Sequence, residues 1–253
     1  MKFGFCTGDD CERVAVAAGV GADYVETGFE TLTNEDGAAY EAFRAALDRH
    51  GIRCESANCF IPGSMKLTGE AVDYDALRRY VGRGMERGAA VGLKTVVFGS
   101  GGARNVPEGF SFCEAFRQLT FFLREIAGPL AERHGVNVVV EPLWDSNIIN
   151  TAKEGAMLAA AADRPNVFGL VDLFHMDKMH DKIDNIRDLK GHVMHAHIAE
   201  PSRRVYPLSA EEYDYRSFID ALEAAGCPRC SVEARCDDFA AEAPVTMQLL
   251  RSL

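Results

Sequence analysis

Short apolar, β-branched segments alternate with longer amphipathic segments along the whole chain, and this alternation restricts the fold more than any other feature. Eight short segments have the length and composition of buried strands: Lys2–Cys6, Tyr24–Thr27, Arg53–Asn58, Thr95–Phe98, Asn137–Glu141, Phe168–Asp172, His192–Ile198 and Cys230–Ala234. The segments between them have apolar residues at steps of three and four, as helices do: Tyr40–His50, Tyr74–Val91, Glu114–His134, Lys153–Ala162, Tyr215–Ala225 and Phe239–Leu250. Such alternation favours an α/β fold with a parallel sheet.

The spacing of the eight units favours a closed (β/α)8 TIM barrel over an open doubly wound sheet. The 253 residues give about 32 residues per unit, close to the ~31 of a typical barrel. An open sheet usually has a Gly-rich fingerprint after its first strand, and Cys6-Thr7-Gly8-Asp9 is not one. No linker, charge block or short repeat interrupts the pattern. We therefore expect a single barrel domain over residues 1–253.

Composition excludes several classes of protein. The chain has 27 Lys and Arg against 38 Asp and Glu, a formal net charge of −11, and lacks the basic cluster that a nucleic-acid backbone requires. No stretch approaches the roughly 18 apolar residues of a membrane helix, and Asp9 and Asp10 interrupt any signal-peptide core. We expect a cytoplasmic protein without nucleic-acid or membrane partners, whose eight cysteines are reduced thiols.

Four consecutive predicted strands end in an ionisable side chain after an apolar run: Glu141, Asp172, His197 and Glu233. They are separated by 31, 25 and 36 residues, each about one βα unit. The carboxyl ends of barrel strands form the mouth where active sites lie, so these side chains should converge. A charged group at the end of an apolar strand is costly unless it is paired or bound to metal. The pattern therefore predicts a site for one cation.

The expected donors indicate which metal would bind. Three carboxylates and one imidazole form a hard, oxygen-rich set that suits Mn²⁺ best, with Mg²⁺ or Co²⁺ as further candidates. Zn²⁺ is less favoured because its usual sites contain more His or Cys.

Two further ionisable residues belong near this site. His195 points to the same strand face as His197, and only one of them fits comfortably at the metal. We take His197 as the ligand and His195 as a deeper residue of the core or of the shell behind the ligand. Glu26 ends the second strand and either reaches the site or serves the core.

Three segments near the expected mouth have a functional and a structural interpretation. The Gly99–Gly102 segment could hold a phosphate, but barrel phosphate sites usually follow strands seven and eight, which favours a loop lining the mouth. Trp144 and Phe60 could flank a sugar, and large aromatic residues at least as often serve packing.

Several motifs resemble those of a known superfamily. They are Asn58–Gly63 with Lys66–Gly69, Val97–Arg104 with Pro107–Gly109, Glu141–Leu143, Asp172–Met176, and His195–Glu200 followed by Arg203. The chain resembles the xylose isomerase-like superfamily of sugar isomerases and epimerases, nearest the branch with D-tagatose/D-psicose 3-epimerases and hydroxypyruvate isomerases.

This resemblance implies roles for individual residues. Glu141, Asp172, His197 and Glu233 would bind one divalent metal ion, and Glu141 and Glu233 would also be the acid/base pair. His175 and Arg203 would hold the oxygens of the substrate. In the epimerases a second Glu also binds substrate; here that segment is two residues shorter and Asp145 falls in its place. Related barrels form dimers or tetramers, which implies a homo-oligomer.

The implied reaction is proton transfer α to a carbonyl through an enediolate, as in a ketose isomerase or epimerase of carbohydrate metabolism. The alternative is a sugar or inosose dehydratase on the same metal-binding barrel. A nuclease resembling the endonuclease-four branch would require more His and Asp ligands and a basic surface. A sugar-binding module without catalysis would not require the intact set of four ligands.

Overall fold

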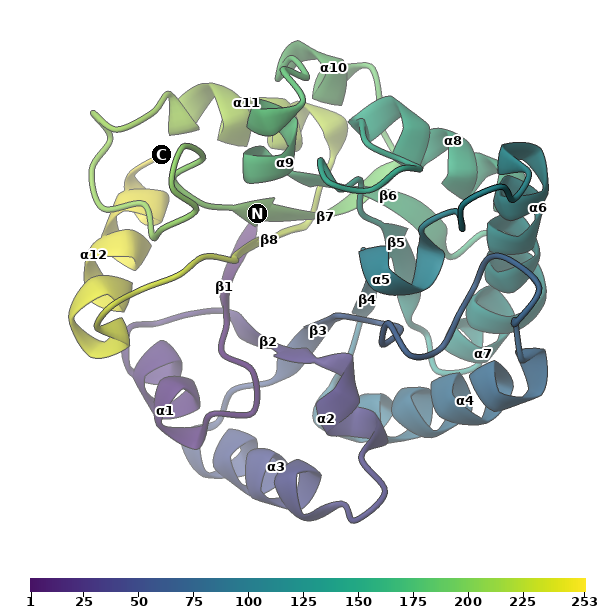
Figure 1. Cartoon of the computed structure of the whole chain (residues 1–253). Coiled ribbons are helices and arrows are strands. Elements are labelled where there is room, and N and C mark those ends of the chain that lie inside the picture. Colours follow the sequence, from purple (N-terminus) through teal and green to yellow (C-terminus); the bar gives the residue numbers. More distant parts are fainter.

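The computed structural model describes all 253 residues, and its strands form a closed parallel barrel in chain order (Figure 1). The strands are β1 (Lys2–Cys6), β2 (Tyr24–Gly28), β3 (Cys54–Asn58), β4 (Thr95–Phe98), β5 (Asn137–Val140), β6 (Val167–Asp172), β7 (Val193–Ile198) and β8 (Arg229–Val232). Pairing of β1 with both β2 and β8 closes the sheet. The predicted (β/α)8 barrel is confirmed, and each predicted strand end lies within two residues of the observed one.

Helices surround the barrel (Figure 1). The longer ones are α1 (Cys11–Gly19), α3 (Ala38–His50), α4 (Tyr74–Val91), α6 (Phe112–Phe122), α8 (Ala152–Ala162), α11 (Tyr215–Ala225) and α12 (Phe239–Ser252). Shorter ones are α2 (Phe29–Thr33), α5 (Gly101–Arg104), α7 (Gly128–Glu132), α9 (Leu173–Lys178) and α10 (Asp184–Arg187). None of the helices has both the length and the apolar character needed to cross a membrane.

The predicted helix Glu114–His134 is a continuous helical run with a change of winding inside it. A π-helical segment, η1 (Leu123–Ala127), joins α6 to α7. The apolar positions continue through it, since Leu119, Leu123 and Ile126 are all fully buried. Spacing of apolar residues alone therefore predicted the buried face but not the wider turn.

Local sequence signals fix where the helices begin and end. The Asp73 carboxylate accepts hydrogen bonds from the backbone of Asp75 and Ala76 at the start of α4. The same helix ends at Gly92, whose φ of 98° is the left-handed conformation that glycine adopts readily. Thr151 and Glu154 form a capping box at the start of α8.

The strands bury both of their faces. A cluster of 63 residues, including Val96 and Val138, fills the space between strands and helices. The alternate positions Val97, Val139 and Leu170 form a separate small cluster, which places them inside the barrel. Continuous apolar strands, rather than alternating ones, follow from this two-sided burial.

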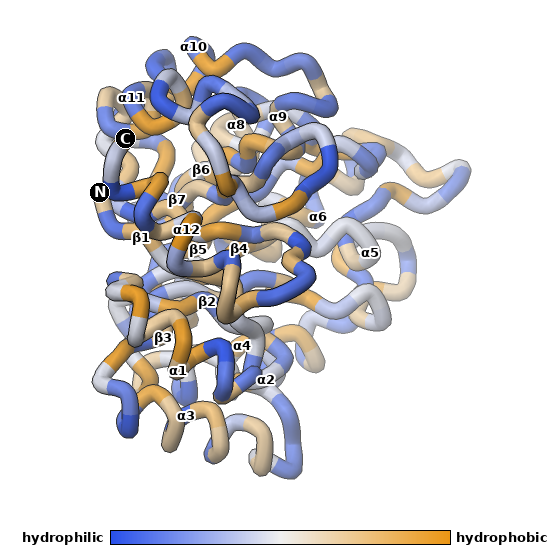
Figure 2. Tube along the Cα trace, turned by 90° about the vertical axis from the view of Figure 1, so that its left-hand side faces the viewer, coloured by the Kyte–Doolittle hydropathy of each residue, from blue (hydrophilic) through white to orange (hydrophobic).

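The barrel interior also contains polar groups. The Tyr24 ring occupies the space where a side chain on Gly4 would stand, 2.6 Å from the position of its Cβ atom. Tyr24 Oη lies 2.8 Å from Ser231 Oγ, and both residues are fully buried. Deeper still, at the amino ends of the strands, Glu55 accepts hydrogen bonds from Lys2 and Arg229. In the side view, α5 and the longest loops project on the side away from the N-terminus, as expected for the mouth (Figure 2).

Candidate active site

The barrel brings the four strand-end residues together. Glu141, Asp172, His197 and Glu233 each place one potential ligand atom so that all four atoms lie within 4.8 Å of one another. Asp172 and His197 belong to β6 and β7, while Glu141 and Glu233 directly follow β5 and β8. The four strand ends therefore converge as the sequence predicts, because the strand register of a closed barrel places the carboxyl ends of adjacent strands at the same height along the barrel axis.

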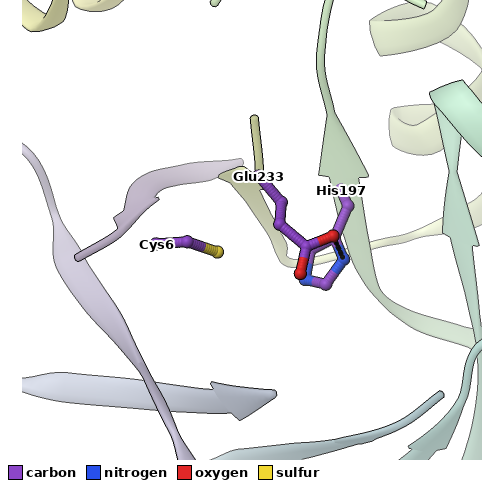
Figure 3. A group of neighbouring side chains, drawn as sticks. All are labelled: Cys6, His197 and Glu233. Atoms are coloured by element: carbon purple, nitrogen blue, oxygen red, sulfur yellow. Dashed lines mark ion pairs between the residues drawn. The ribbon is translucent and has the colours of Figure 1, made fainter. Parts of the chain in front are cut away.

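His197 lies at the centre of this group, and its ring is fully buried. Its Nδ1 atom is 3.0 Å from Glu141 Oε1, 3.2 Å from Glu233 Oε2 and 3.8 Å from Asp172 Oδ2. Figure 3 shows the Glu233 carboxylate beside the His197 ring, with the Cys6 thiol pointing toward them. Three carboxylates thus surround one point that favours positive charge.

The electrostatics at this point agree with the geometry. Burial disfavours a charged imidazole, but the charges of Glu233 and Glu26 and hydrogen bonds to Glu141 and Glu233 raise the pKa of His197 well above its ordinary value. Burial likewise opposes ionisation of Glu233, but the charges of His197 and Arg204 and a hydrogen bond to His197 lower its pKa to about 2. The carboxylates of the cluster thus favour positive charge at this point, and the group could hold a metal ion.

Only one of the two carboxylate oxygens of Asp172 accepts hydrogen bonds. Oδ1 accepts hydrogen bonds from the backbone of Phe174 at 2.7 Å and His175 at 3.3 Å, which caps α9. Oδ2 is buried and has no hydrogen-bond partner. Burial and the nearby charges of Glu141 and Glu233 raise the pKa of Asp172, against a lowering by His175 and His197. A buried carboxylate oxygen without a partner needs a proton or a cation.

Glu141 reaches this position because residue 99 lacks a side chain. A Cβ atom on Gly99 would lie 2.2 Å from Glu141 Oε2, far inside contact distance. Gly99 follows β4 directly, so the loop after β4 and the residue after β5 share this space. The glycine is a steric requirement of the cluster.

A pocket of about 440 Å³ opens above the cluster, and Glu141 and Glu233 line its floor. The other polar and aromatic residues that line it are Glu30, Asn58, Cys59, Ser100, Trp144, Asp145, His175 and Arg204. This volume is within the range of small-molecule sites. The pocket is lined mainly by polar groups, so it suits a hydrophilic ligand.

Two of the three residues that were predicted to contact substrate line this pocket. His175 is almost fully buried, with Nε2 3.7 Å from Asp172 Oδ2 and Nδ1 accepting a hydrogen bond from the Trp144 backbone. Asp145 lies on the exposed segment after β5. Both residues therefore line the same pocket as Glu141 and Glu233.

The third residue, Arg203, does not reach the pocket. Its exposed guanidinium donates to Glu200 Oε2 at 3.1 Å and lines a different surface hollow. Its neighbour Arg204 turns inward instead and donates to Glu233 Oε2 at 2.6 Å. The backbone of Arg204 is left-handed, with φ of 55°, and its guanidinium lies 4.8 Å from the Phe174 ring centroid. At this turn of the loop Arg204, rather than the predicted Arg203, faces the pocket.

Beneath the four strand-end residues, His195 occupies the deeper position predicted for it. Its Nε2 lies 2.9 Å from Glu26 Oε2, while Glu26 Oε1 lies 3.0 Å from His197 Nε2. Glu26 thus reaches the cluster from behind and does not line the pocket. Burial opposes its ionisation, but the charges of both histidines and their hydrogen bonds lower the pKa of Glu26 well below its ordinary value.

The structure also shows where the three segments lie for which a functional and a structural interpretation were both open. Phe60 is fully buried and packs edge-on against Phe29 and Phe98, so it belongs to the core. Trp144 remains 46% exposed at the pocket. Ser100, Gly101 and Gly102 line the mouth, and Ser100 Oγ accepts a hydrogen bond from the Ile61 backbone.

Sequence reasoning gave no individual role at the site to Asn58, Gly99 or Arg204, although Asn58 and Gly99 belong to segments that it singled out. Asn58 donates to Glu233 Oε1 at 2.8 Å from the end of β3. Asn58 also stands at a strand end, but its strand contains Glu55 and Ser56 and is not an apolar run, so the pattern that selected the four strand-end residues does not select it. No sequence signal distinguishes Arg204 from Arg203 or gives the contact between Gly99 and Glu141.

Comparisons with known proteins agree with the barrel. The chain is 36% identical over 86 residues to the D-psicose 3-epimerase of Ruminiclostridium cellulolyticum, a match that covers 33% of this chain and 29% of that enzyme. The structure of 3-keto-D-glucoside 4-epimerase from E. coli superposes with a TM-score of 0.82 at 22% identity, covering 100% of both chains. D-allulose 3-epimerase from Methylomonas sp., in complex with D-allulose, gives a TM-score of 0.85 at 18% identity, covering 100% of this chain and 96% of that one.

These relatives are sugar epimerases, which are isomerases. A family model described as xylose isomerase-like TIM barrel matches residues 14–253, nearly the whole chain. The protein is therefore a member of the xylose isomerase-like TIM barrel family.

Proposed function

We propose that this protein is a divalent-metal-dependent ketose isomerase or epimerase of carbohydrate metabolism that transfers a proton α to a carbonyl. One observation supports this most directly: three carboxylates and an imidazole place their ligand atoms within 4.8 Å of one another, and the buried Asp172 Oδ2 has no hydrogen-bond partner. A cluster of like charges destabilises a folded chain unless a cation is held there.

The donors fit a hard divalent ion. Glu141, Asp172, His197 and Glu233 would hold it, and oxygen donors favour Mn²⁺, with Mg²⁺ or Co²⁺ as alternatives. When bound, such an ion polarises a carbonyl and stabilises negative charge that develops on its oxygen. The remaining chemistry belongs to side chains of this protein.

Glu141 and Glu233 are placed to move protons. They follow β5 and β8, the outer two of four adjacent strands, so they flank Asp172 and His197 from opposite sides. A carboxylate that removes a proton on one side of a substrate and another that returns it on the other side produce an epimer. Return to the neighbouring carbon produces an aldose from a ketose. General acid/base catalysis of this kind contributes roughly 10²–10⁴-fold.

Substrate hydroxyls would meet the polar walls of the pocket. His175 and Asp145 line it, as does Arg204, and we assign to Arg204 the oxygen-binding role that was predicted for Arg203. The half-exposed Trp144 offers an apolar surface to a sugar ring. The relatives that act on psicose, allulose and a keto-glucoside make a ketose the preferred class.

Isotope exchange tests the proposal. Protein loaded with Mn²⁺ is incubated with a panel of ketoses in D₂O, beside a control treated with a chelator. We expect deuterium at the carbon next to the carbonyl, together with an epimer or aldose, only in the loaded sample. Loss of water from the sugar would instead identify a dehydratase. Absence of exchange with every ketose would contradict the proposal.

A further inference from the structure

Glu26 is a buried carboxylate that the proposed reaction does not use. It lies near the end of β2, is fully buried and is absent from the pocket wall. Its Oε1 faces His197 Nε2 at 3.0 Å, and its Oε2 faces His195 Nε2 at 2.9 Å. Ser231 also donates to Oε2, at 2.6 Å. Both oxygens are thus occupied on the side away from the pocket.

These contacts determine where the imidazole hydrogens lie. An ionised carboxylate only accepts hydrogen bonds, so each histidine must carry its hydrogen on Nε2. When His197 is neutral, as a metal ligand must be, its lone pair lies on Nδ1, the atom that faces Glu141 and Glu233 at 3.0 and 3.2 Å. Nδ1 is consequently the nitrogen available to a cation.

His195 provides an independent sign of the same arrangement. Its Nδ1 is buried without a hydrogen-bond partner. A buried acceptor without a partner costs less than a buried N–H without one. The other neighbours of its Nε2, Ser56 and Ser231, are more distant at 3.3 and 3.4 Å. The Nε2–H tautomer therefore fits His195 better than the alternative.

A chain of hydroxyl groups holds Glu26 in this orientation. Tyr24 Oη lies 2.8 Å from Ser231 Oγ, whose hydroxyl hydrogen is directed to Glu26. Tyr24 therefore donates to Ser231, which in turn donates to Glu26. Since Tyr24 and Ser231 are fully buried, water does not compete for these bonds.

We propose that Glu26 is a positioning residue that locks His195 and His197 as Nε2–H tautomers and so presents His197 Nδ1 to the metal. The inference rests on the proposed function, because it assigns the orientation of one of the proposed ligands. It also implies that Glu26, His195 and His197 do not form a second metal site, although their ligand atoms lie close together. Each Glu26 oxygen is already used by an N–H donor.

Metal affinity provides the first test. In Glu26→Gln the amide offers one acceptor and one donor, so it can satisfy only one of the two N–H groups. Mn²⁺ affinity, measured by isothermal titration calorimetry, should fall about 10–100-fold, as is typical for partners of metal ligands. The matched control is Glu55→Gln, which alters another buried, doubly paired carboxylate at the far end of the barrel and should leave Mn²⁺ affinity unchanged. Equal affinity of Glu26→Gln and wild type would overturn the inference.

Nitrogen NMR provides a second test that needs no variant. In ¹⁵N-histidine-labelled wild type, metal-free protein should show His195 as the Nε2–H tautomer, and Zn²⁺-loaded protein should show His197 bound through Nδ1. A hydrogen on Nδ1 of His195, or coordination through Nε2 of His197, would refute it. If wild type binds neither Mn²⁺ nor Zn²⁺, the proposed function fails, while the His195 tautomer still decides the role of Glu26.

Discussion

The two ends of the barrel interior treat buried carboxylates in opposite ways. At the amino end, one carboxylate, Glu55, meets two cations, and Arg229 donates to it at 2.7 Å. At the mouth, Glu141, Asp172 and Glu233 surround one imidazole, and Arg204 pairs with Glu233 at 2.6 Å; one oxygen of Asp172 has no hydrogen-bond partner. At the amino end, cationic side chains outnumber the carboxylate. At the mouth, carboxylates outnumber the cationic side chains.

The ion pairs of Glu55 stabilise the fold, whereas the carboxylates at the mouth are arranged as a binding site would be. A carboxylate paired with two cations favours the folded state. Like charges held near one another destabilise the folded state. At the mouth they stay close together because the hydrogen-bonded strands of the barrel fix the positions of the strand ends. We therefore expect the mouth, and not the amino end, to gain stability from a cation supplied from solution. Four experiments examine this contrast, in order of expected effect.

Removing one carboxylate from the mouth should abolish turnover. Glu233→Gln keeps the shape of the side chain but cannot accept a proton, so the rate should fall by roughly 10²–10⁴-fold. Steady-state rates with a ketose identified by isotope exchange provide the measurement, with circular dichroism to verify folding. Glu55→Gln, matched in chemistry at the other end, should keep the wild-type rate. Full activity in Glu233→Gln would exclude its assignment as acid or base.

Adding one methyl group beside the mouth should displace Glu141. In Gly99→Ala the new Cβ atom would lie 2.2 Å from Glu141 Oε2, so the carboxylate must move. Displacement of a reacting group by about 1 Å can cost about 10²-fold in rate. Gly82→Ala in α4 is the control, because a Cβ atom there would meet no atom within 4 Å and Gly82 does not line the pocket. Comparable rates for the two variants would show that Glu141 tolerates displacement.

A divalent ion should stabilise the folded protein by binding at the mouth and at no other place in the barrel. Mn²⁺ at 100 times its dissociation constant should add about 2.7 kcal/mol to the free energy of unfolding. Urea denaturation with and without Mn²⁺ measures this increment. Glu55→Gln should retain it, and Asp172→Asn should lose most of it, because the free Oδ2 position becomes an amide or a neutral oxygen. An increment that survives in Asp172→Asn would place the ion elsewhere.

The amino end should respond to acid rather than to metal. Burial opposes ionisation of Glu55, but hydrogen bonds and charges from Lys2 and Arg229 lower its pKa. Its contribution to stability is therefore present above the unfolded value of about 4.3 and is lost as pH falls through the lower folded value. Wild type should exceed Glu55→Gln by about 1–3 kcal/mol at pH 6, and the difference should shrink below about pH 4. Urea denaturation at several pH values would show it; a difference constant from pH 3 to 6 would contradict the assignment.

Much of the architecture follows from the order of residues along the chain. Each βα unit occupies about the same length, so the repeat of apolar strands gives the barrel and aligns its strand ends. Glu141, Asp172, His197 and Glu233 were found by counting, because one unit of spacing along the chain corresponds to one step around the barrel. Distance in sequence is a sufficient guide where backbone hydrogen bonds fix the register.

Tertiary structure alone decided the contacts that depend on loops and on opposite walls of the barrel. Arg204 faces the pocket and Arg203 does not because the backbone turns to φ of 55° after Glu200, a conformation that few non-glycine residues adopt. Glu26 meets two histidines from β7 across the barrel, 169 and 171 residues away. The sequence around Glu26 gives no sign of such contacts, since the residues near it along the chain do not depend on which side chains face it across the barrel. The sequence by itself determined the barrel and which strand ends gather at its mouth; side-chain direction in loops and across the core arose only when the chain closed on itself.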